Sequence, residues 1–319
     1  MDAAIDLKDL TRRFGELSAV DGLSLQVYPG QIYGLVGPDG AGKTTTLRLL
    51  CGALRITSGE ARVAGFDVAR QTDAVRERIG YMPQRFALYE ELTVLENIRF
   101  FAEVRGIAAG EWLPRSMEIL RFVGMDEFAQ RRAGQLSGGM KQKLGLAVAL
   151  MHQPPVLLLD EPTTGVDPVT RQDFWQLLIR LVTAPQPVAV LVSTPYMDEA
   201  SRCQRVGFLR GGSLLVEGTP DELRASLNGR VIEWLGEPVA ALRHLAQQVE
   251  GVQDVQAFGD RLHLRVEAGE AMAVIERLQA VELAPQVTSR RLRLVTPHLE
   301  DVFMALLEGE QPGSVRQGG

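Results

Sequence analysis

The stretch GPDGAGKT, residues 37–44, matches the pattern G-x-x-x-x-G-K-[ST], which marks a loop that cradles phosphate groups. Glycines let the backbone turn its N–H groups inward and approach the phosphate oxygens closely, here at Gly37, Gly40 and Gly42. Lys43 is placed to reach the β- and γ-phosphates, and Thr44 offers a hydroxyl to Mg²⁺. The stretch therefore predicts a nucleotide site.

The runs on either side of this loop support the prediction, because a phosphate loop joins a strand to a helix. QIYGLVG (31–37) predicts a buried strand, and TTTLRLLCGAL (44–54) predicts a helix whose positive end faces the bound anion. Two further apolar runs, PVLLLDEP (155–162) and PVAVLVST (187–194), alternate with helical patterns. Such strands indicate a largely parallel sheet that helices cover on both faces.

A phosphate loop requires an acidic partner for Mg²⁺, and the second apolar run ends in one. Asp160 follows three leucines at a strand end, where an open parallel sheet places its ligand-binding groups. We expect Asp160 to hold the metal, usually through water, and Glu161 to orient or polarise the attacking water. Alone, such a pair is commonly a turn after a strand. Together with the phosphate loop it predicts a hydrolytic site.

Length and composition agree with a two-domain globular chain, since it has 319 residues, of which 45% are hydrophobic and 23% charged. The formal net charge of −6 gives no basic field for nucleic acid. Cys51 and Cys203 are too few for a disulfide framework and fit a reducing compartment. We recognise neither a signal peptide nor a membrane-spanning run, so we expect a cytoplasmic location.

The pattern of the chain changes near residue 223. Residues 1–223 mix strands with helices, and the mostly helical stretch 86–150 is interpreted as an insert on the sheet domain. Residues 224–309 predict the β-α-β-β-α-β order of a ferredoxin-like unit, with a turn at Gly259-Asp260 and a last helix over 299–307. The polar, glycine-rich residues 310–319 predict a disordered tail.

Between the phosphate loop and Asp160 lies LSGGMKQ (136–142), which resembles the signature sequence of the ABC-family ATPases. The resemblance covers about residues 5–222. It implies an α/β fold of the P-loop NTPase type, with a mixed β-sheet core and a helical subdomain, here followed by a small α+β C-terminal domain. In that family Ser137, Gly138 and Gly139 contact the γ-phosphate of a nucleotide held by the opposite subunit. The resemblance thus implies two subunits that close head to tail on ATP and Mg²⁺.

Other positions match the family's pattern, and their roles are carried over from it. Phe14 stands where the family has an aromatic that stacks on adenine, although a core aromatic is the alternative. Val20 stands where a small apolar residue flanks the base. Gln84 matches the glutamine that reaches Mg²⁺ and the attacking water, and Asp167 matches the aspartate that communicates across the dimer. The other nucleotide-binding positions of the loop are Pro38, Asp39, Ala41 and Thr45.

The run STPYMDEA (193–200) departs from the family, which usually has a histidine where Pro195 stands. Proline donates no hydrogen bond from its side chain or backbone, so the γ-phosphate loses a partner. Loss of one such donor costs about 10²–10³-fold in rate, by analogy with oxyanion-hole deletions. We expect intact ATP binding with slow or partner-dependent hydrolysis. The alternative is that Pro195 is tolerated and that Glu161 suffices.

The closing run PHLEDVFMALLEG (297–309) is similar to the end of ATP-binding subunits of bacterial drug and antibiotic exporters, although its apolar spacing also fits plain helix packing. The leading hypothesis is therefore the motor subunit of an ABC exporter, peripheral on the cytoplasmic face of the membrane. It would pair with a second ATP-binding subunit, identical or different, and drive a separate integral membrane permease. Phe86, Leu88 and Tyr89 are candidates for the permease contact or, equally, for the core of the insert.

Two other functions are carried as alternatives. A soluble ABC ATPase acting on ribosomes or DNA usually has two ATP-binding units in one chain or long coiled-coil insertions, and this chain shows neither. An ATP-dependent dimerising regulator would bind ATP without turning it over. Pro195 favours that regulator, and Glu161 opposes it.

Overall fold

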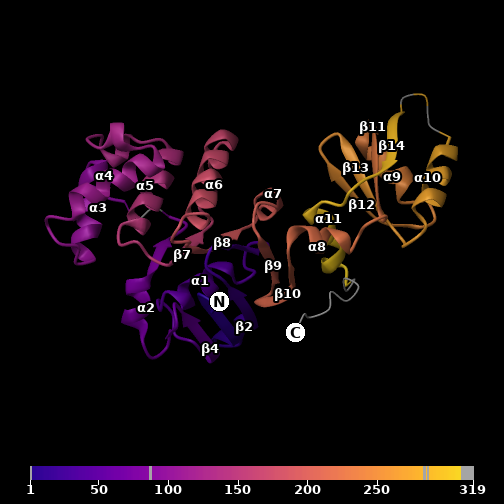
Figure 1. The fold of residues 1–319 in the computed structure, drawn as a ribbon. Helices are drawn as coiled ribbons and strands as arrows, with labels where there is room; N and C mark the ends of the chain where they lie inside the picture. Colours follow the sequence, from indigo (N-terminus) through magenta and orange to yellow (C-terminus); the bar gives the residue numbers. More distant parts are fainter. Residues whose placement is uncertain (1, 86–87, 283–284, 286, 310–319) are drawn as a thin grey trace. The chain divides into compact units, whose positions relative to one another are not determined.

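The computed structural model describes residues 2–85, 88–282, 285 and 287–309, and the chain forms two compact units (Figure 1). We call Met1–Glu217 the cassette unit and Gly218–Gly319 the C-terminal unit. The division falls before α8 (Pro220–Ala225), which packs against α11 (Leu299–Leu307) and so belongs to the second unit. The tail predicted for residues 310–319 lies outside the described residues.

The cassette unit contains two sheets. One has six strands in the order β10-β9-β3-β8-β7-β6, and β9, β3, β8, β7 and β6 pair in parallel, as the apolar runs predict. Its strands are β3 (Ile32–Val36), β6 (Ile79–Met82), β7 (Val156–Asp160), β8 (Ala189–Thr194), β9 (Arg205–Arg210) and β10 (Ser213–Gly218).

The second sheet of the cassette unit has four antiparallel strands in the order β2-β1-β4-β5. The strands are β1 (Ile5–Phe14), β2 (Leu17–Val27), β4 (Ser58–Val63) and β5 (Phe66–Asp67). The sequence patterns did not distinguish this sheet from the parallel one, because the strands of both sheets are short runs that contain β-branched residues. The two sheets together confirm the predicted mixed α/β class.

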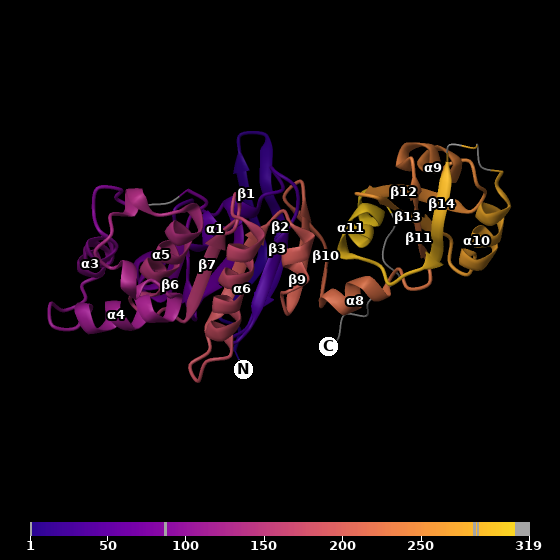
Figure 2. The ribbon, with the colours of Figure 1, turned by 90° about the horizontal axis from the view of Figure 1, so that it is seen from above.

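Helix α1 (Lys43–Leu50) lies in the core between the two sheets, where it contacts β2 and β4 on one side and β7 and β8 on the other. Leu47 and Leu158 belong to the same buried apolar cluster. Helix α6 (Pro168–Val182) packs against β3 and β8 of the parallel sheet (Figure 2). The contacts of α1 with both sheets fix the position of this helix, which follows the phosphate loop.

The predicted insert is a group of helices from residue 94 onward, and Phe86 and Ala87 lie outside the described residues. Its main helices pack against one another, and Thr93 caps the first of them in a capping box with Glu96. They are α3 (Val94–Val104), α4 (Trp112–Val123) and α5 (Gly138–Leu150). The short helices of the cassette unit are α2 (Thr72–Arg78), η1 (Asp126–Phe128), η2 (Ala133–Gln135) and α7 (Met197–Ala200).

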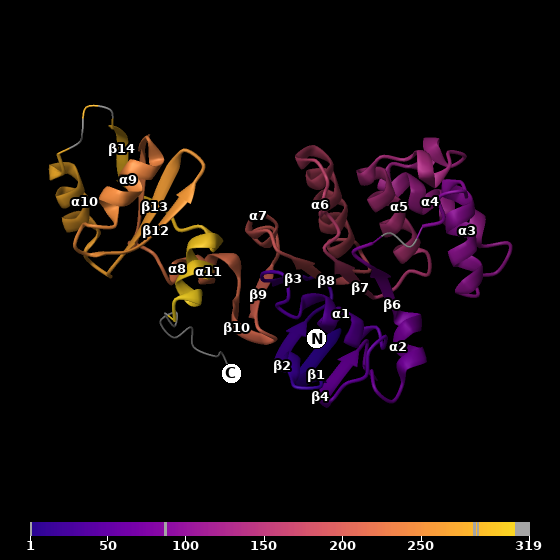
Figure 3. The same ribbon diagram turned by 180° about the vertical axis from the view of Figure 1, so that it is seen from behind.

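After α8, the C-terminal unit has the element order β-α-β-β-α-β followed by α11, and its antiparallel sheet runs β12-β13-β11-β14 (Figure 3). Trp234, Leu262 and Leu292 pair across three strands on the sheet face that forms the apolar core with the two helices. The opposite face carries a polar row that includes Glu233 and His263. The elements are β11 (Val231–Glu237), α9 (Val239–Ala246), β12 (Val252–Phe258), β13 (Arg261–Val266), α10 (Ala271–Ala280) and β14 (Thr288–Leu294).

Among the described residues, none of the helices combines the length and the apolar character needed to cross a membrane.

Candidate functional site

The loop of residues 37–44 runs from the end of β3 into α1, as its pattern predicts. Gly40 and Gly42 have φ of 78° and 105°, a region that favours glycine. A Cβ on Gly37 would lie 2.3 Å from the Leu209 carbonyl oxygen, so this position has no room for a side chain. Of the other predicted loop positions, Pro38 and Asp39 are exposed, Thr45 is half-buried and Ala41 is buried.

Lys43, the first residue of α1, has its ammonium group buried inside the loop. It donates hydrogen bonds to the carbonyls of Gly37 at 2.8 Å and Pro38 at 3.1 Å. It also lies 3.3 Å from Glu161 Oε1, and both side chains are buried, with 4% and 8% of their surfaces exposed. A buried ion pair of this kind joins the phosphate loop to the acidic end of β7.

Asp160, the last residue of β7, is the acceptor for two hydroxyl groups. Thr44 Oγ1 donates to Asp160 Oδ1 at 2.9 Å, and Ser193 Oγ donates to the same oxygen at 2.8 Å. The second oxygen, Oδ2, is buried and has no hydrogen-bond partner among the described residues. A buried carboxylate oxygen beside a threonine hydroxyl fits the hard, oxygen-preferring Mg²⁺ ion that the motif implies.

Glu161 and Gln84 meet across the site although 77 positions separate them in the sequence. Gln84, in the loop after β6, donates from Nε2 to Glu161 Oε2 at 3.0 Å, and the Thr164 hydroxyl donates to the same oxygen at 3.3 Å. Glu161 has a φ of 48°, which an L-residue adopts only when its surroundings impose it. The Glu161 N–H donates to Ser193 Oγ at 3.0 Å and thereby helps to hold this conformation.

The signature residues and Asp167 begin two helices. Ser137 is the N-cap of α5, where its hydroxyl accepts a hydrogen bond from the Met140 N–H at 3.3 Å. Ser137 and Gly138 are exposed, whereas a Cβ on Gly139 would lie 2.1 Å from Thr170. Asp167 caps α6 and is exposed, and the backbone N–H of Thr170 holds the pKa of its carboxyl below the usual value.

Comparison with known proteins identifies the family to which a chain with this arrangement belongs. A protein-family model described as "ABC transporter" matches residues 20–164 of the chain. The chain is 38% identical over 308 residues to the Nod factor export ATP-binding protein I of Paraburkholderia xenovorans, and the match covers 96% of this chain and 97% of that protein. The chain belongs to the ABC transporter ATP-binding proteins. The resemblance stated from LSGGMKQ is thereby confirmed.

Another relative within the ABC family is much longer than this chain. The probable multidrug ABC transporter ATP-binding protein YbhF of Escherichia coli is 40% identical over 315 residues, a match that covers 97% of this chain but 53% of that protein. The chain thus spans about half the length of this relative. Among solved structures, a dimeric bacterial ABC transporter cassette is 29% identical with a TM-score of 0.61, covering 67% of this chain and 98% of that chain.

The two base-binding positions carried over from the ABC family lie in the β1–β2 hairpin and differ in exposure. Phe14 ends β1, is 44% exposed, and has the Arg12 guanidinium 4.4 Å from its ring centroid. It is therefore not the core aromatic of the alternative interpretation. Val20 is fully buried in the core, so its side chain offers no surface to a base in this arrangement.

Pro195 follows β8 at the position of the family's histidine. The residues around it form a buried network centred on Glu199, which accepts hydrogen bonds from Thr163 and, at 2.6 Å, from Thr194. Arg171 Nε of α6 lies 3.5 Å from the same carboxylate. These contacts fasten the end of β8 to the loop after Glu161, yet none of them supplies a donor from position 195.

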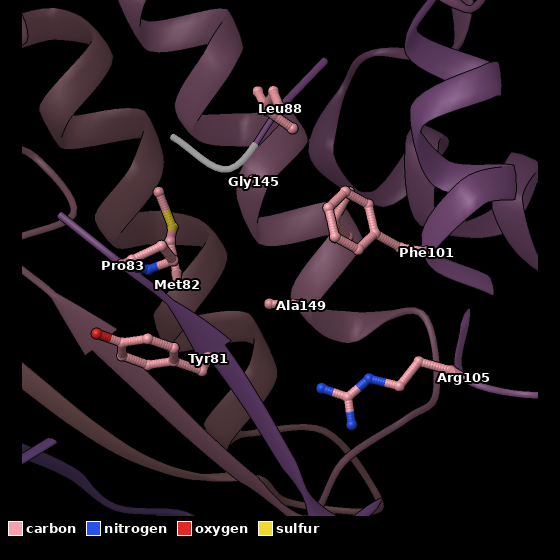
Figure 4. Close-up of a pocket in the computed structure, with 9 residues that line it drawn as sticks. Tyr81, Met82, Pro83, Leu88, Phe101, Arg105, Gly145 and Ala149 are labelled. Atoms are coloured by element: carbon pink, nitrogen blue, oxygen red, sulfur yellow. The ribbon is translucent and has the colours of Figure 1, made fainter. Parts of the chain in front are cut away.

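A hollow of about 110 Å³ lies between β6, the start of the insert and α5 (Figure 4). Leu88, a predicted permease contact, lines it together with Phe101, and Tyr81 and Met82 form its floor on the sheet side. Tyr89 is 49% exposed, and its ring packs edge-on against Phe100 with centroids 4.7 Å apart. Phe86, the third predicted contact, lies outside the described residues.

Sequence reasoning missed Ser193 and Thr164 as parts of the site. Ser193 bridges Asp160 and the Glu161 backbone, and Thr164 contacts the Glu161 carboxylate. The signal for Ser193 was available, because it ends an apolar run that neighbours the Asp160 strand in a parallel sheet. Nothing in the sequence pattern distinguishes Thr164 from Thr163.

Proposed function

We propose that this chain is the ATP-binding and ATP-hydrolysing motor subunit of an ABC exporter, which dimerises around ATP and drives a separate membrane permease. The observation that carries the proposal is the chain of contacts from Lys43 through Glu161 to Gln84. Relatives matched over nearly their full length include the linearmycin resistance ATP-binding protein LnrL of Bacillus subtilis, 31% identical over 309 residues. An antibiotic or similar drug-like compound is therefore the class of cargo that we propose for the permease.

ATP binds with its phosphates in the loop of residues 37–44. Its β- and γ-phosphate oxygens replace the two loop carbonyls as partners of Lys43, because an ammonium group binds an anion more strongly than a neutral carbonyl. Thr44, Asp160 and Gln84 would hold the accompanying Mg²⁺, which would supply positive charge to neutralise the phosphates. The exposed ring of Phe14 serves as the platform for adenine.

Glu161 orients the attacking water. Its carboxylate accepts a hydrogen bond from the water and draws the proton away from the oxygen that attacks the γ-phosphate. Gln84 and Thr164 both contact Oε2 and leave Oε1 facing Lys43, so the carboxylate is held in one orientation. Gln84 also reports the state of the site to the insert, which begins a few residues later.

A second subunit completes each site. The exposed Ser137 and Gly138, at the positive end of α5, contact the γ-phosphate of ATP bound to the partner, and Asp167 communicates between the two sites. Pro195 deprives the γ-phosphate of one donor, which slows hydrolysis by about 10²–10³-fold without preventing ATP binding. The partner is a second copy of this chain or a related subunit.

The permease docks on the insert at the hollow lined by Leu88 and Phe101, with the exposed Tyr89 beside it. An apolar concave surface next to the loop of Gln84 couples nucleotide state to the membrane subunits. The chain is then peripheral on the cytoplasmic face of the membrane. Leu88→Asp should abolish co-purification with the permease and leave ATP binding unchanged, since Leu88 lies outside the phosphate site.

A complementation assay tests the proposed function. Lys43→Ala removes the phosphate-loop cation, and Ser137→Arg blocks the signature surface, so each variant alone should be inactive. Mixed in equal amounts, half of the dimers contain both chains, and one of their two sites combines an intact loop with an intact signature. We expect ATP turnover of about a quarter of the wild-type rate from this pairing, because only sites shared between chains regain both halves.

The outcome separates the candidate functions. Recovery of turnover in the mixture supports a shared ATPase site. Two inactive variants whose mixture also stays inactive, beside an active wild type, would exclude a site shared between copies. A wild type that binds ATP and dimerises without turnover, with or without the permease, would instead identify the ATP-dependent regulator.

A further inference from the structure

We propose that the C-terminal unit contains a binding site for a divalent transition-metal ion, with Zn²⁺ as the representative ion, formed by His263, His298 and Asp301. One ligand atom from each of the three lies within 4.8 Å of the others. The site is separate from the nucleotide site of the cassette unit and does not depend on the proposed transport function.

The first argument is the geometry of the buried pair. His263 on β13 and Asp301 on α11 are 2% and 4% exposed, and His263 Nδ1 lies 3.0 and 3.1 Å from the two carboxylate oxygens. Ligands of a tetrahedral Zn²⁺ at about 2.0–2.1 Å from the ion lie about 3.3 Å from one another. An ion can therefore enter between Nδ1 and the carboxylate with shifts of a few tenths of an ångström.

The second argument concerns the third ligand. His298 precedes α11 and is exposed, and its ring centroid lies 4.8 Å from that of His263. Its side chain also takes part in the capping box at the start of α11, so one ring nitrogen is engaged there and the other is the one left for an ion held by the other two ligands. Its backbone N–H donates to Asp301 Oδ2 at 2.6 Å, which fixes the carboxylate and leaves lone pairs of Oδ1 for an ion.

The third argument is access. A hollow of about 400 Å³ on the polar face of the sheet is lined by both histidines and gives an ion an entry path and room for a water ligand. Arg261 and Arg293 also line it, but their guanidinium groups are bound to the buried Glu233 at 3.1 and 2.9 Å. The carboxylate of Glu233 thus partly neutralises the two arginines, which weakens their repulsion of a cation bound at the three ligands.

The ligand set selects the class of ion. Two imidazoles and one carboxylate suit Zn²⁺, Ni²⁺, Co²⁺ or Cu²⁺, whereas Mg²⁺ and Ca²⁺ require a set made mainly of oxygens. Three protein ligands leave at least one position for water. Bound there, the ion would fasten the start of α11 to β13, two segments 38 positions apart in the sequence.

The test titrates the full-length chain, freed of metal with a chelator and then dialysed, with Zn²⁺ in a buffer that contains Mg²⁺ and no nucleotide. We expect the wild type to bind one Zn²⁺ ion. His298→Ala should bind this ion at least about 100-fold more weakly, because one of three ligands is lost. His244→Ala, at an exposed histidine on α9, is the matched control and should retain it. His298→Cys should restore binding, since a thiolate is a zinc ligand.

A second readout does not depend on affinity. Bound Zn²⁺ should slow amide hydrogen exchange of residues 299–307 in the wild type and in His244→Ala, but not in His298→Ala. Equal Zn²⁺ stoichiometry and affinity in wild type and His298→Ala, with unchanged exchange of α11, would overturn the proposal and identify the cluster as a plain histidine–aspartate hydrogen bond.

Discussion

Each of the two units buries a basic side chain against a carboxylate, and the two pairs are held in different ways. In the cassette unit Lys43, at the start of α1, faces Glu161, and Lys43 also contacts two loop carbonyls that ATP would replace in the proposed mechanism. In the C-terminal unit His263 faces Asp301 between a strand and a helix. In the proposed mechanism, the Lys43 side of the first pair exchanges its carbonyl partners for phosphate oxygens. The second fastens one element to another.

The contrast teaches that burial of charge does not by itself indicate catalysis. In the Lys43–Glu161 pair Glu161 has a positive φ, and glycines and the unpaired carboxylate oxygen of Asp160 lie nearby, all of which are costly for folding. The His263–Asp301 pair lies on regular elements, and Asp301 also caps the first turn of α11. We therefore expect variants of the first pair to lose activity and variants of the second to lose stability.

The largest effect should come from Glu161→Gln, which breaks the cassette pair by removing the charge that orients water. ATP turnover should fall about 10³-fold, because a positioned general base contributes 10²–10⁴-fold. The amide keeps the size of the side chain, so ATP binding and the thermal unfolding temperature should change little. The exposed Glu60→Gln on β4 is the control. Turnover within threefold of wild type would remove Glu161 from the mechanism.

Pro195→His supplies the hydrogen-bond donor that the γ-phosphate lacks in the cassette unit. Turnover should rise about 10–100-fold, somewhat less than the cost of a lost donor, since the surrounding network around Glu199 was formed with proline in place. A steady-state ATPase assay of wild type and variant at equal concentration measures the change. Equal rates would show that Glu161 suffices and that proline is tolerated.

Asp301→Ala breaks the pair in the C-terminal unit. It leaves the buried His263 without its partner and uncaps α11, so local opening should become easier by about 2–4 kcal/mol. Hydrogen exchange of residues 261–266 and 299–307 measures this, while ATP affinity should stay unchanged. Asp260→Ala, at an exposed ion pair with Arg261, should have little effect. Unchanged exchange at α11 would contradict the fastening role.

The smallest effect concerns a half-buried histidine that has no acidic partner in the described part of the chain. His152 Nε2 donates to the Ile79 carbonyl at 2.9 Å, and burial, with Arg105 nearby, lowers its pKa to about 4. A histidine in the unfolded chain titrates near 6.5, so the unfolded state binds more protons between pH 6.5 and 4 and the free energy of unfolding falls through that window. In His152→Gln this fall should be smaller by about 1 kcal/mol, given the partial exposure of the ring. Denaturant melts at pH 7 and pH 4.5 measure it, and an equal fall in both proteins would contradict the lowered pKa.

Much of the cassette unit could be predicted because its motifs dictate local geometry. The phosphate loop and the acidic strand end each specify a junction of strand, loop and helix, and the signature specifies the start of a helix. The structure brings Thr44 to Asp160 and Gln84 to Glu161. Two other features depend on tertiary packing. The burial of Val20 and the separate antiparallel sheet depend on which strands pair, which short β-branched runs do not reveal.

The C-terminal unit shows the opposite balance. Alternating patterns predict its strand and helix order, and the structure has that order with α11 over the predicted residues 299–307. The cluster of His263, His298 and Asp301 was not predictable, because no motif spacing links a strand residue to the start of a helix more than thirty positions later. Only the register of β11 with β13 and the placement of α11 bring these side chains together.

The most direct test of the central claim is the dependence of Mg-ATP turnover on protein concentration, with Lys43→Ala as the blank. If two copies form each site, total turnover should rise faster than linearly with concentration until the dimer saturates, at a slow rate that Pro195→His increases. Turnover strictly proportional to concentration, or none above the Lys43→Ala blank while ATP is bound, would contradict a site built from two copies of this chain.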